Sequence, residues 1–260
     1  MIRQIKSLKN ELNINDSYFF CSFLKLLNSD RRKIVYIIKA SKLYSDAIFL
    51  GETDPNIAFV LLVSSIESVA EDFFCSSGIN NFTDLFVKES EICEIMKKTK
   101  AKYGVQNKKI SDLFINDKSN KNTKIPIDIK FMFFLIKFMP HESPPNIGDI
   151  SENYQLNWNE KIKMLEAFAT IYNYRSRYLH DGTSFPLPML LSPLQFPFKF
   201  YPEKPPANCY HEGIYFDEMA LPMYLYVFEY IVQKSIKNWW LDLSNINTEL
   251  VAEYNLEECL

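Results

Sequence analysis

The sequence predicts an all-α protein, and three observations support this fold class. Only 6 of the 260 residues are glycine. Few segments alternate apolar and polar residues with a period of two, and long segments repeat apolar residues at helical spacing. With 47% hydrophobic residues, including 21 Phe and 15 Tyr, the chain has ample apolar material for a packed core, and this composition excludes a disordered chain.

The first residues predict a helical extension followed by a longer helix. Residues 1–29 begin with a polar stretch, and Asp16 is placed to cap a helix that runs through Leu27. Asp30 then precedes a segment with apolar residues at positions 34, 37, 38, 44, 47 and 48. Gly51 is a suitable residue to end that helix.

The next helix is expected to be central in the protein. Thr53 or Asp54 can cap it, and Pro55 suits its first position. The segment is apolar on all sides until Ser64 and amphipathic afterwards, which indicates a helix buried at one end. Glu67 lies on the flank of its apolar stripe. This carboxylate either has a buried partner or is an exposed residue at the edge of the stripe.

The middle of the chain predicts several further helices. Shorter helices are expected over 81–97 and about 109–117, on either side of a lysine-rich connection. A strongly apolar helix over 126–139 should stop at Pro140. After a loop, Asn157 or Asn159 is expected to cap a long helix that ends near Gly182.

The segment from about 184 to 216 predicts a largely non-helical insertion. Seven of the 13 prolines lie in 184–206, a density that neither a helix nor a central strand accommodates. Its apolar residues favour packing onto the helices as a structural lid over binding another protein, and a short hairpin pairing 196–201 with 210–216 is expected. A final helix should cover 217–241, with Pro222 in its first turn or kinking it. Residues 242–260 form an acidic tail with five acidic and no basic residues.

The charge distribution argues against a protein that coats nucleic acid by charge alone. The formal net charge is −3, whereas such proteins are usually basic. Lysines are nevertheless concentrated between Lys97 and Lys124, a stretch that contains nine lysines and only two aspartates. This run is either a solvated surface or a surface that follows phosphates, with Lys97 and Lys98 as candidate RNA-binding residues.

Other residue types restrict the cofactor and the location. The five cysteines include no C-x-x-C pair, so we expect reduced thiols in a cytoplasmic protein. No signal-peptide pattern precedes the fold, and the longest apolar runs, 57–63 and 131–136, are too short to span a membrane. The three histidines are far apart in sequence, and no phosphate-binding motif occurs. We therefore expect no metal and no cofactor.

The stretch IYNYRSRYLHDG (171–182) carries the most informative chemistry. The planar guanidinium of Arg175 can bind a phosphate through two hydrogen bonds. Histidine as a residue type titrates near neutrality, so His180 is a candidate to take a proton from a ribose 2′-hydroxyl or to give one to the leaving oxygen. Arg175 and His180 have the two functions that RNA cleavage without a metal needs, but one histidine cannot easily be base and acid at once, and two copies facing each other across a dimer could supply both. Arg177 is a further candidate for RNA binding.

The segment 175–180 resembles the R-x(4–6)-H signature of the HEPN superfamily. Residues 41–74, with Ile66 and Glu67, are similar to two early helices of its Apea-like branch, and 130–140 and the final helix fit the same plan. The resemblance implies a HEPN-like helical bundle over 30–241, with the insertion at about 184–216, that forms a homodimer through the motif helix. Many relatives are metal-independent endoribonucleases of toxin–antitoxin and antiviral defence systems. Others are inactive modules that bind a partner protein or a nucleotide.

By this resemblance, Arg175 would bind the scissile phosphate and His180 would be the acid or base. Ser176 occupies the polar position where asparagine, aspartate or histidine is frequent in the family, and Glu67 would support Arg175. The resemblance also implies RNA as the substrate and an antitoxin or regulatory protein as a possible partner.

Helix geometry leaves two interpretations of the motif open. Five residues place Arg175 and His180 about 140° apart around an ideal helix. Both side chains can address one phosphate only if the helix ends near His180 or if the arginine reaches around it. Alternatively, Arg175 pairs with Glu67 to join two helices, and His180 stabilises a helix C-terminus. The protein is then a non-catalytic module or a purely structural domain.

Overall fold

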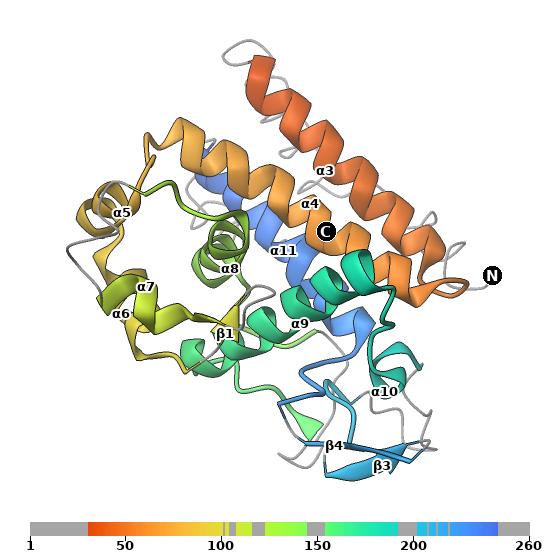
Figure 1. Cartoon of the computed structure of the whole chain (residues 1–260). Helices are drawn as coiled ribbons and strands as arrows, with labels where there is room; N and C mark the ends of the chain where they lie inside the picture. Colours follow the sequence, from red (N-terminus) through yellow and green to blue (C-terminus); the bar gives the residue numbers. More distant parts are fainter. Residues whose placement is uncertain are drawn as a thin grey trace, which may run out of the picture.

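The computed structural model describes residues 31–100, 102–103, 108–115, 123–144, 154–191, 202–206, 208–211, 213–217 and 219–243. Within these ranges the chain is mostly helical, as predicted (Figure 1). The expected extension over 1–29 and the acidic tail beyond residue 243 lie outside the described part.

Two long helices that follow each other in the chain form a helical hairpin. Helix α3 (Arg31–Leu50) ends at the turn that contains Gly51, and helix α4 (Pro55–Ser76) returns beside it. Of the two candidate caps, Asp54 is the N-cap of α4, and its side chain accepts a hydrogen bond from the Ile57 amide at 3.1 Å. Within the pair, the buried Ser65 hydroxyl donates to the Ala40 carbonyl at 2.8 Å. The predicted start of α4 is therefore confirmed.

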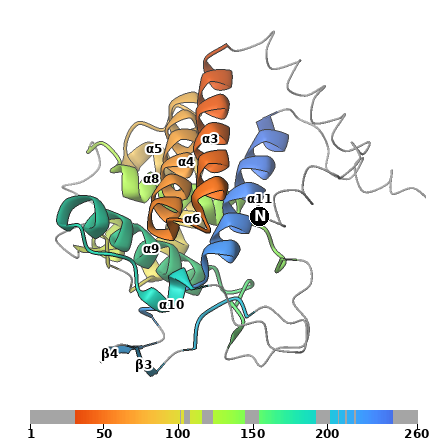
Figure 2. The same ribbon diagram turned by 90° about the vertical axis from the view of Figure 1, so that its right-hand side faces the viewer.

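Helix α4 is the centre of the bundle. It contacts α3, α8 (Ile127–Phe138), α9 (Lys161–Asp181) and α11 (Leu225–Leu243). Helices α3, α4 and α11 run side by side, and α9 crosses them, as both ribbon views show (Figures 1 and 2). Because neighbours surround its first half, residues 58–63 are buried there except Leu61, which is half-buried. The fully buried ring of Phe59 stacks on the rings of Phe185 and Phe228, with distances of 4.7 Å and 5.8 Å between the ring centres.

The lysine-rich region contains more structure than the sequence predicted. Residues 81–97 divide into α5 (Phe82–Lys88) and α6 (Ser90–Lys98), with Glu89 between them. Two short strands, β1 (Lys102–Tyr103) and β2 (Lys108–Lys109), pair antiparallel before α7 (Ile110–Ile115). The expected apolar helix is α8, which ends before Pro140 as predicted and is buried along almost its whole length.

The start of α9 differs from the prediction. Its N-cap is Glu160, whose side chain makes no capping hydrogen bond. Asn157 and Asn159 are not caps. Asn157 instead accepts the Glu160 amide through its carbonyl at 3.0 Å, in a turn that precedes the helix. The side-chain amide of Asn157 donates to Glu160 Oε1 at 2.5 Å, so it does not cap the helix.

The described part of the insertion is largely non-helical, as predicted, but its hairpin is placed differently. A four-residue helix, α10 (Leu187–Leu190), follows the motif helix. The hairpin consists of β3 (Cys209–His211) and β4 (Ile214–Phe216), so both strands come from the second expected segment. Gly213, with a φ of 81°, supplies the left-handed residue in the turn between them. The expected strand at 196–201 lies outside the described residues.

A buried glutamate holds the insertion against the bundle. The side chain of Glu203, 1% exposed, accepts hydrogen bonds from the Leu156 amide and from the Trp158 indole at 2.8 Å. Its own amide donates to the Tyr154 carbonyl at 2.9 Å, and its carbonyl accepts from the Tyr224 amide at 3.0 Å. Burial raises the pKa of the Glu203 carboxyl, and its two hydrogen-bond donors oppose that change. Glu203 thereby connects the segment that precedes α9 with the segment that precedes α11.

The last helix begins later than predicted. Helix α11 starts at Leu225, and Pro222 lies in the preceding segment instead of in its first turn or at a kink. Asp217 explains the delay, because its side chain and its carbonyl both accept the Ala220 amide in a tight turn. The predicted start at residue 217 is therefore wrong by eight residues, whereas the end at Leu243 lies close to the expected one.

Candidate functional site

The motif helix α9 ends one residue after His180. Gly182 is in the left-handed conformation, with a φ of 67°. Its amide donates to the Tyr178 carbonyl at 3.1 Å, and the Thr183 amide donates to the Arg177 carbonyl at 3.4 Å. These bonds satisfy carbonyl groups that a helix leaves unpaired at its end. The helix stop that the sequence predicted at Gly182 is confirmed.

Arg175 is held by a carboxylate from the central helix. Its Nη2 donates to Glu67 Oε2 at 2.8 Å, and the Tyr172 hydroxyl donates to Glu67 Oε1 at 2.8 Å. The Arg175 and Glu67 side chains are only 19% and 15% exposed, and the guanidinium lies 5.5 Å from the centre of the Tyr172 ring. The predicted bond between Glu67 and Arg175 is confirmed, so Glu67 is not an exposed residue at the edge of its stripe.

A second carboxyl group, which the sequence analysis did not single out, lies close to this pair. Asp128 is in the first turn of α8 and is 8% exposed. Burial raises the pKa of Asp128 and the charge of Glu67 adds to this effect, while a hydrogen bond from the Ile129 amide opposes it. The pKa of Tyr172 is also raised, chiefly by burial and next by Glu67. We call Glu67, Asp128, Tyr172 and Arg175 the Glu67 cluster.

The Glu67 cluster joins three helices with an incomplete balance of charge. The cluster contains two carboxyl groups and one guanidinium, which pairs with Glu67, so protonation of Asp128 relieves its repulsion with Glu67. Among the described residues, the buried Nε of Arg175 has no hydrogen-bond partner. Arginine carries five N–H donors, and Glu67 uses one of them. The guanidinium is therefore fixed in position but keeps donors for a further acceptor.

His180 lies apart from this cluster. Its side chain is exposed and makes no hydrogen bond or ion pair with the described part of the chain. Because α9 stays helical through Asp181, His180 and Arg175 keep their separation of about 140° around the axis. Ser176 is 8% exposed and lies one turn before His180. A single chain thus brings Arg175 together with Glu67, and not with His180.

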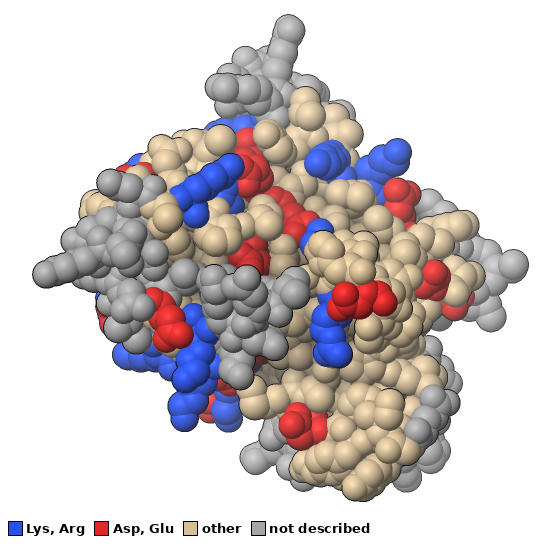
Figure 3. All heavy atoms as spheres, viewed as in Figure 1, with Lys and Arg blue, Asp and Glu red and all other residues tan. Residues whose placement is uncertain are grey.

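The basic residues that the sequence singled out lie on two different elements. Arg177 is exposed on α9, with its guanidinium 6.0 Å from the centre of the Tyr174 ring. Lys97 and Lys98 end α6, and Lys97 pairs with Glu94 at 2.7 Å. On the face drawn in Figure 3, acidic and basic side chains of the described residues are interspersed and form no continuous basic surface. This distribution favours a solvated surface for the described part of the lysine-rich region.

Helix α6 also lies at the far end of the motif helix. Lys161, the first residue of α9, pairs with Glu91 of α6 at 3.4 Å. Arg175 and His180 are near the other end of α9. Lys97 and Lys98 therefore do not belong to the surroundings of the motif.

The described residues contain no group of three or more His, Cys, Asp or Glu side chains that could hold a metal ion. Among the same residues, no helix is long and apolar enough to cross a lipid bilayer. Comparison with protein-family models, with curated proteins and with solved structures gives no match for this chain. The fold and the site define a mostly helical protein with a fixed arginine and an exposed histidine on one long helix.

Proposed function

We propose that the protein is a metal-independent endoribonuclease of the HEPN type that works as a homodimer through α9. The observation that carries this proposal is the arrangement of Arg175 and His180 on the motif helix. Glu67 fixes the guanidinium, and the helix ends immediately after His180, whose side chain is exposed. A cation suited to binding phosphate and an imidazole able to act as acid or base therefore occur within two turns of each other.

The reaction needs three actions from these groups. One imidazole accepts the proton of a ribose 2′-hydroxyl, and the resulting oxygen attacks the adjacent phosphorus. The bond from phosphorus to the 5′-oxygen of the next nucleotide breaks, and an acid donates a proton to that oxygen. The products are a 2′,3′-cyclic phosphate and a 5′-hydroxyl. Arg175 would stabilise the negative charge on the phosphate oxygens as the bonds change.

A homodimer overcomes two limitations of the single chain. One histidine cannot be base and acid in the same step, and His180 diverges from Arg175 on its own helix. A second copy whose α9 packs against the first would supply a second imidazole and a second guanidinium. Leu179, which is 50% exposed between the two motif residues along the chain, provides an apolar contact for such packing.

Digestion of RNA by the purified full chain tests the proposal. Wild type is incubated with single-stranded RNA in EDTA, and the products are analysed for cyclic phosphate ends. His180→Ala should lower the cleavage rate by about 10²-fold or more, as expected for loss of a general acid or base. His141→Ala is the matched control, because His141 is also exposed but lies after α8, and it should cleave like wild type. Equal activity of His180→Ala and wild type, or ends without a cyclic phosphate, contradicts the proposal.

One observation favours a second candidate, a non-catalytic module that binds a partner protein. The charge of Arg175 is already paired inside the chain with Glu67, and such a pair can simply join α4 to α9. A toxin or defence nuclease should arrest growth on expression in a way that depends on His180. Growth arrest that persists in His180→Ala, combined with no RNA cleavage by wild type, supports the partner-binding module.

A further inference from the structure

A pocket lies beside the first half of α9, away from the Glu67 cluster. Its volume is about 430 Å³, within the range of small-molecule sites. Its lining comes from the turn before α9, from α9 itself and from the segments before and after the β3–β4 hairpin. The lining residues used below are Leu156, Lys163, Ala167, Thr170, Lys204 and Met219.

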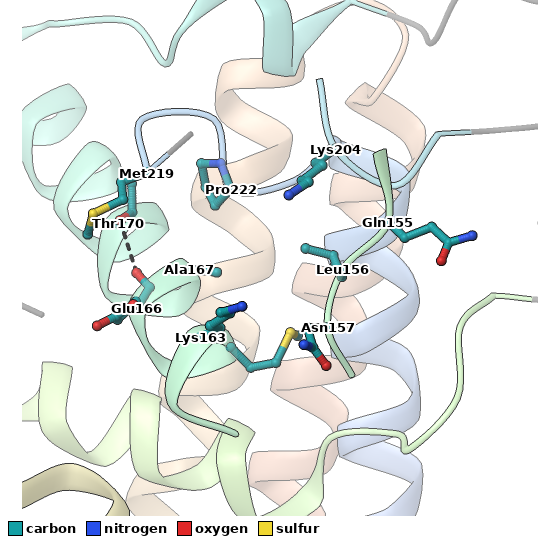
Figure 4. A pocket seen from close by; sticks show the side chains of 11 residues that line it. Gln155, Leu156, Asn157, Lys163, Glu166, Ala167, Thr170, Lys204, Met219 and Pro222 are labelled. Carbon is teal, nitrogen blue, oxygen red and sulfur yellow. Dashed lines mark hydrogen bonds between the residues drawn. The ribbon is translucent and has the colours of Figure 1, made fainter. Parts of the chain in front are cut away.

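The pocket combines an apolar floor with the ammonium groups of two lysines. One of them, Lys163, pairs with the exposed side chain of Glu160 at 3.0 Å, and because exposed ion pairs contribute little, a phosphate can compete for this lysine. In Figure 4, Leu156 and Ala167 lie in the middle, and the ends of Lys163 and Lys204 lie on different sides of them. Glu166 is at the edge opposite Lys204, and the Thr170 hydroxyl donates to the Glu166 carbonyl at 2.9 Å. A ligand that matches this lining has an apolar, flat part and at least one strongly anionic group.

The walls of the pocket are held in place before a ligand arrives. The buried Glu203 lies next to Lys204 in the chain, and its side chain accepts the amide of Leu156, another lining residue. The carbonyl of Ala220 accepts the Tyr174 hydroxyl at 2.9 Å, which holds the chain beside Met219 against α9. A site built in advance in this way spares the ligand most of the ordering that binding otherwise requires.

Helix geometry connects the pocket to the exposed histidine. Lys163, Ala167 and Thr170 follow each other at intervals of four and three residues, and this side of α9 continues through Arg177 toward His180. Thr170 and His180 are separated by roughly 15 Å along the axis, at 1.5 Å per residue. Arg175 lies on another side of the helix. At 100° per residue, Arg177 lies within about 20° of Thr170 on the side that carries the pocket, and His180 lies about 60° further around the axis.

We infer that this pocket binds one nucleotide, with its phosphate between Lys163 and Lys204 and its base against the apolar floor. Resting on the proposed function, the inference identifies that nucleotide as part of the RNA strand whose further length passes Arg177 to reach His180. The same chemistry would accept a free nucleotide, and the experiment separates these two sources.

Binding is measured on the full chain carrying His180→Ala, so that RNA is not cut. The probes are a fluorescein-labelled single-stranded RNA of about ten nucleotides, followed by anisotropy, and AMP, followed by calorimetry. Lys163→Ala combined with Lys204→Ala should weaken RNA binding about tenfold or more, and should reduce the dependence of log K on log salt by about 0.7, as expected when one phosphate is no longer neutralised. Lys42→Ala combined with Lys237→Ala is the matched control, because both lysines are exposed on other helices. This control should bind RNA like its parent.

A second variant tests the shape of the pocket without changing its charge. Ala167→Phe fills the floor and should weaken RNA binding as strongly as the two lysine substitutions, while thermal unfolding verifies that each variant is folded. AMP binding that needs the two lysines, without RNA binding, supports the nucleotide site and identifies a free nucleotide as its occupant. Unchanged affinity for both probes in the lysine and Ala167 variants, or no binding of either probe by the parent, overturns the inference.

Failure of the inference and failure of the proposed function have different signatures. If wild type cleaves RNA and the lysine variant, with His180 restored, cleaves equally well, the nuclease proposal stands and the pocket inference fails. If RNA binding depends on the lysines but wild type does not cleave, the pocket inference stands and the nuclease proposal fails.

Discussion

The bond between Glu67 and Arg175 leads to the sharpest quantitative prediction. Arg175→Met retains most of the side-chain volume and removes the charge. The hydrogen bond from the Tyr172 hydroxyl to Glu67 remains, but Glu67 loses the cation that neutralises it. Removing one partner of a fully buried ion pair costs about 3–5 kcal/mol, and pairs on the surface contribute about 0–1 kcal/mol. At 19% and 15% exposure of the two side chains, we expect a loss of about 2–3 kcal/mol in the free energy of unfolding.

Urea unfolding followed by far-UV circular dichroism measures this loss. With an m-value of about 2–3 kcal/mol/M, the midpoint of Arg175→Met should fall by roughly 1 M. The double variant Glu67→Gln with Arg175→Met removes both charges and keeps a side-chain carbonyl for Tyr172. It should therefore recover about 1–2 kcal/mol relative to the sum of the single variants.

The matched control is Glu94→Gln, which removes one partner of a more exposed pair. The side chains of Lys97 and Glu94 are 32% and 56% exposed, so this change should shift the urea midpoint far less than Arg175→Met does. If Arg175→Met shifts the midpoint no more than Glu94→Gln does, or if the double variant shows no coupling, then the pair does not join α4 and α9 as argued. The result also bears on nuclease assays, because an Arg175 variant can lose activity through unfolding alone.

Three further predictions concern other buried or constrained residues. Burial and the charge of Glu67 raise the pKa of Asp128 in the folded protein. The protonated form of Asp128 therefore stabilises the fold below about pH 3.9, the pKa of an unfolded aspartate. This stabilisation is lost as the pH rises through the raised pKa of the folded protein. Asp128→Asn should therefore be more stable than wild type at pH 7 and no more stable at pH 4 in urea unfolding, and the opposite order refutes the assignment. Glu203→Gln replaces one acceptor oxygen by a donor, so it should cost about 1–3 kcal/mol and change the emission of Trp158. In Gly182→Ala, the added Cβ would meet no atom within 4 Å, so only the left-handed backbone conformation opposes the substitution. We expect a loss of about 1–2 kcal/mol in the free energy of unfolding, measured by thermal unfolding. An unchanged melting temperature would contradict this explanation.

The order of the helices was predictable where local chemistry determines it. Asp54 and Pro55 mark the start of α4, and Gly182 marks the end of α9, because caps and left-handed residues depend on neighbours in the chain. The start of α11 was not predictable in the same way. A turn made by Asp217 competes with the helix, and the sequence contains apolar helix formers on both sides of Pro222.

The candidate site was predictable only in part. The bond between Glu67 and Arg175 was expected in two ways, as a support for the arginine that the family resemblance implied and as a pair that simply joins two helices. Asp128 was missed because it begins a segment that looks uniformly apolar, and Glu203 was missed because it lies among prolines. In both cases an acidic residue inside an apolar or proline-rich segment was the available signal. That Arg175 and His180 diverge was predictable, since the angle follows from their spacing alone.

The anchoring of the insertion at both ends has a consequence for how its length can vary. On one side Phe185 and Met189 are buried in the core, and the Phe185 amide donates to the Asn56 side chain at 2.9 Å. On the other side Glu203 is fixed, and the Pro202 carbonyl accepts the Tyr226 hydroxyl at 2.6 Å. The entropy of closing a segment between two fixed points changes only slowly with its length, by about 0.6 kcal/mol for each doubling. Inserting residues between Met189 and Pro202 should therefore be tolerated, whereas loss of the Glu203 anchor should release the wall of the pocket that Leu156 and Lys204 form.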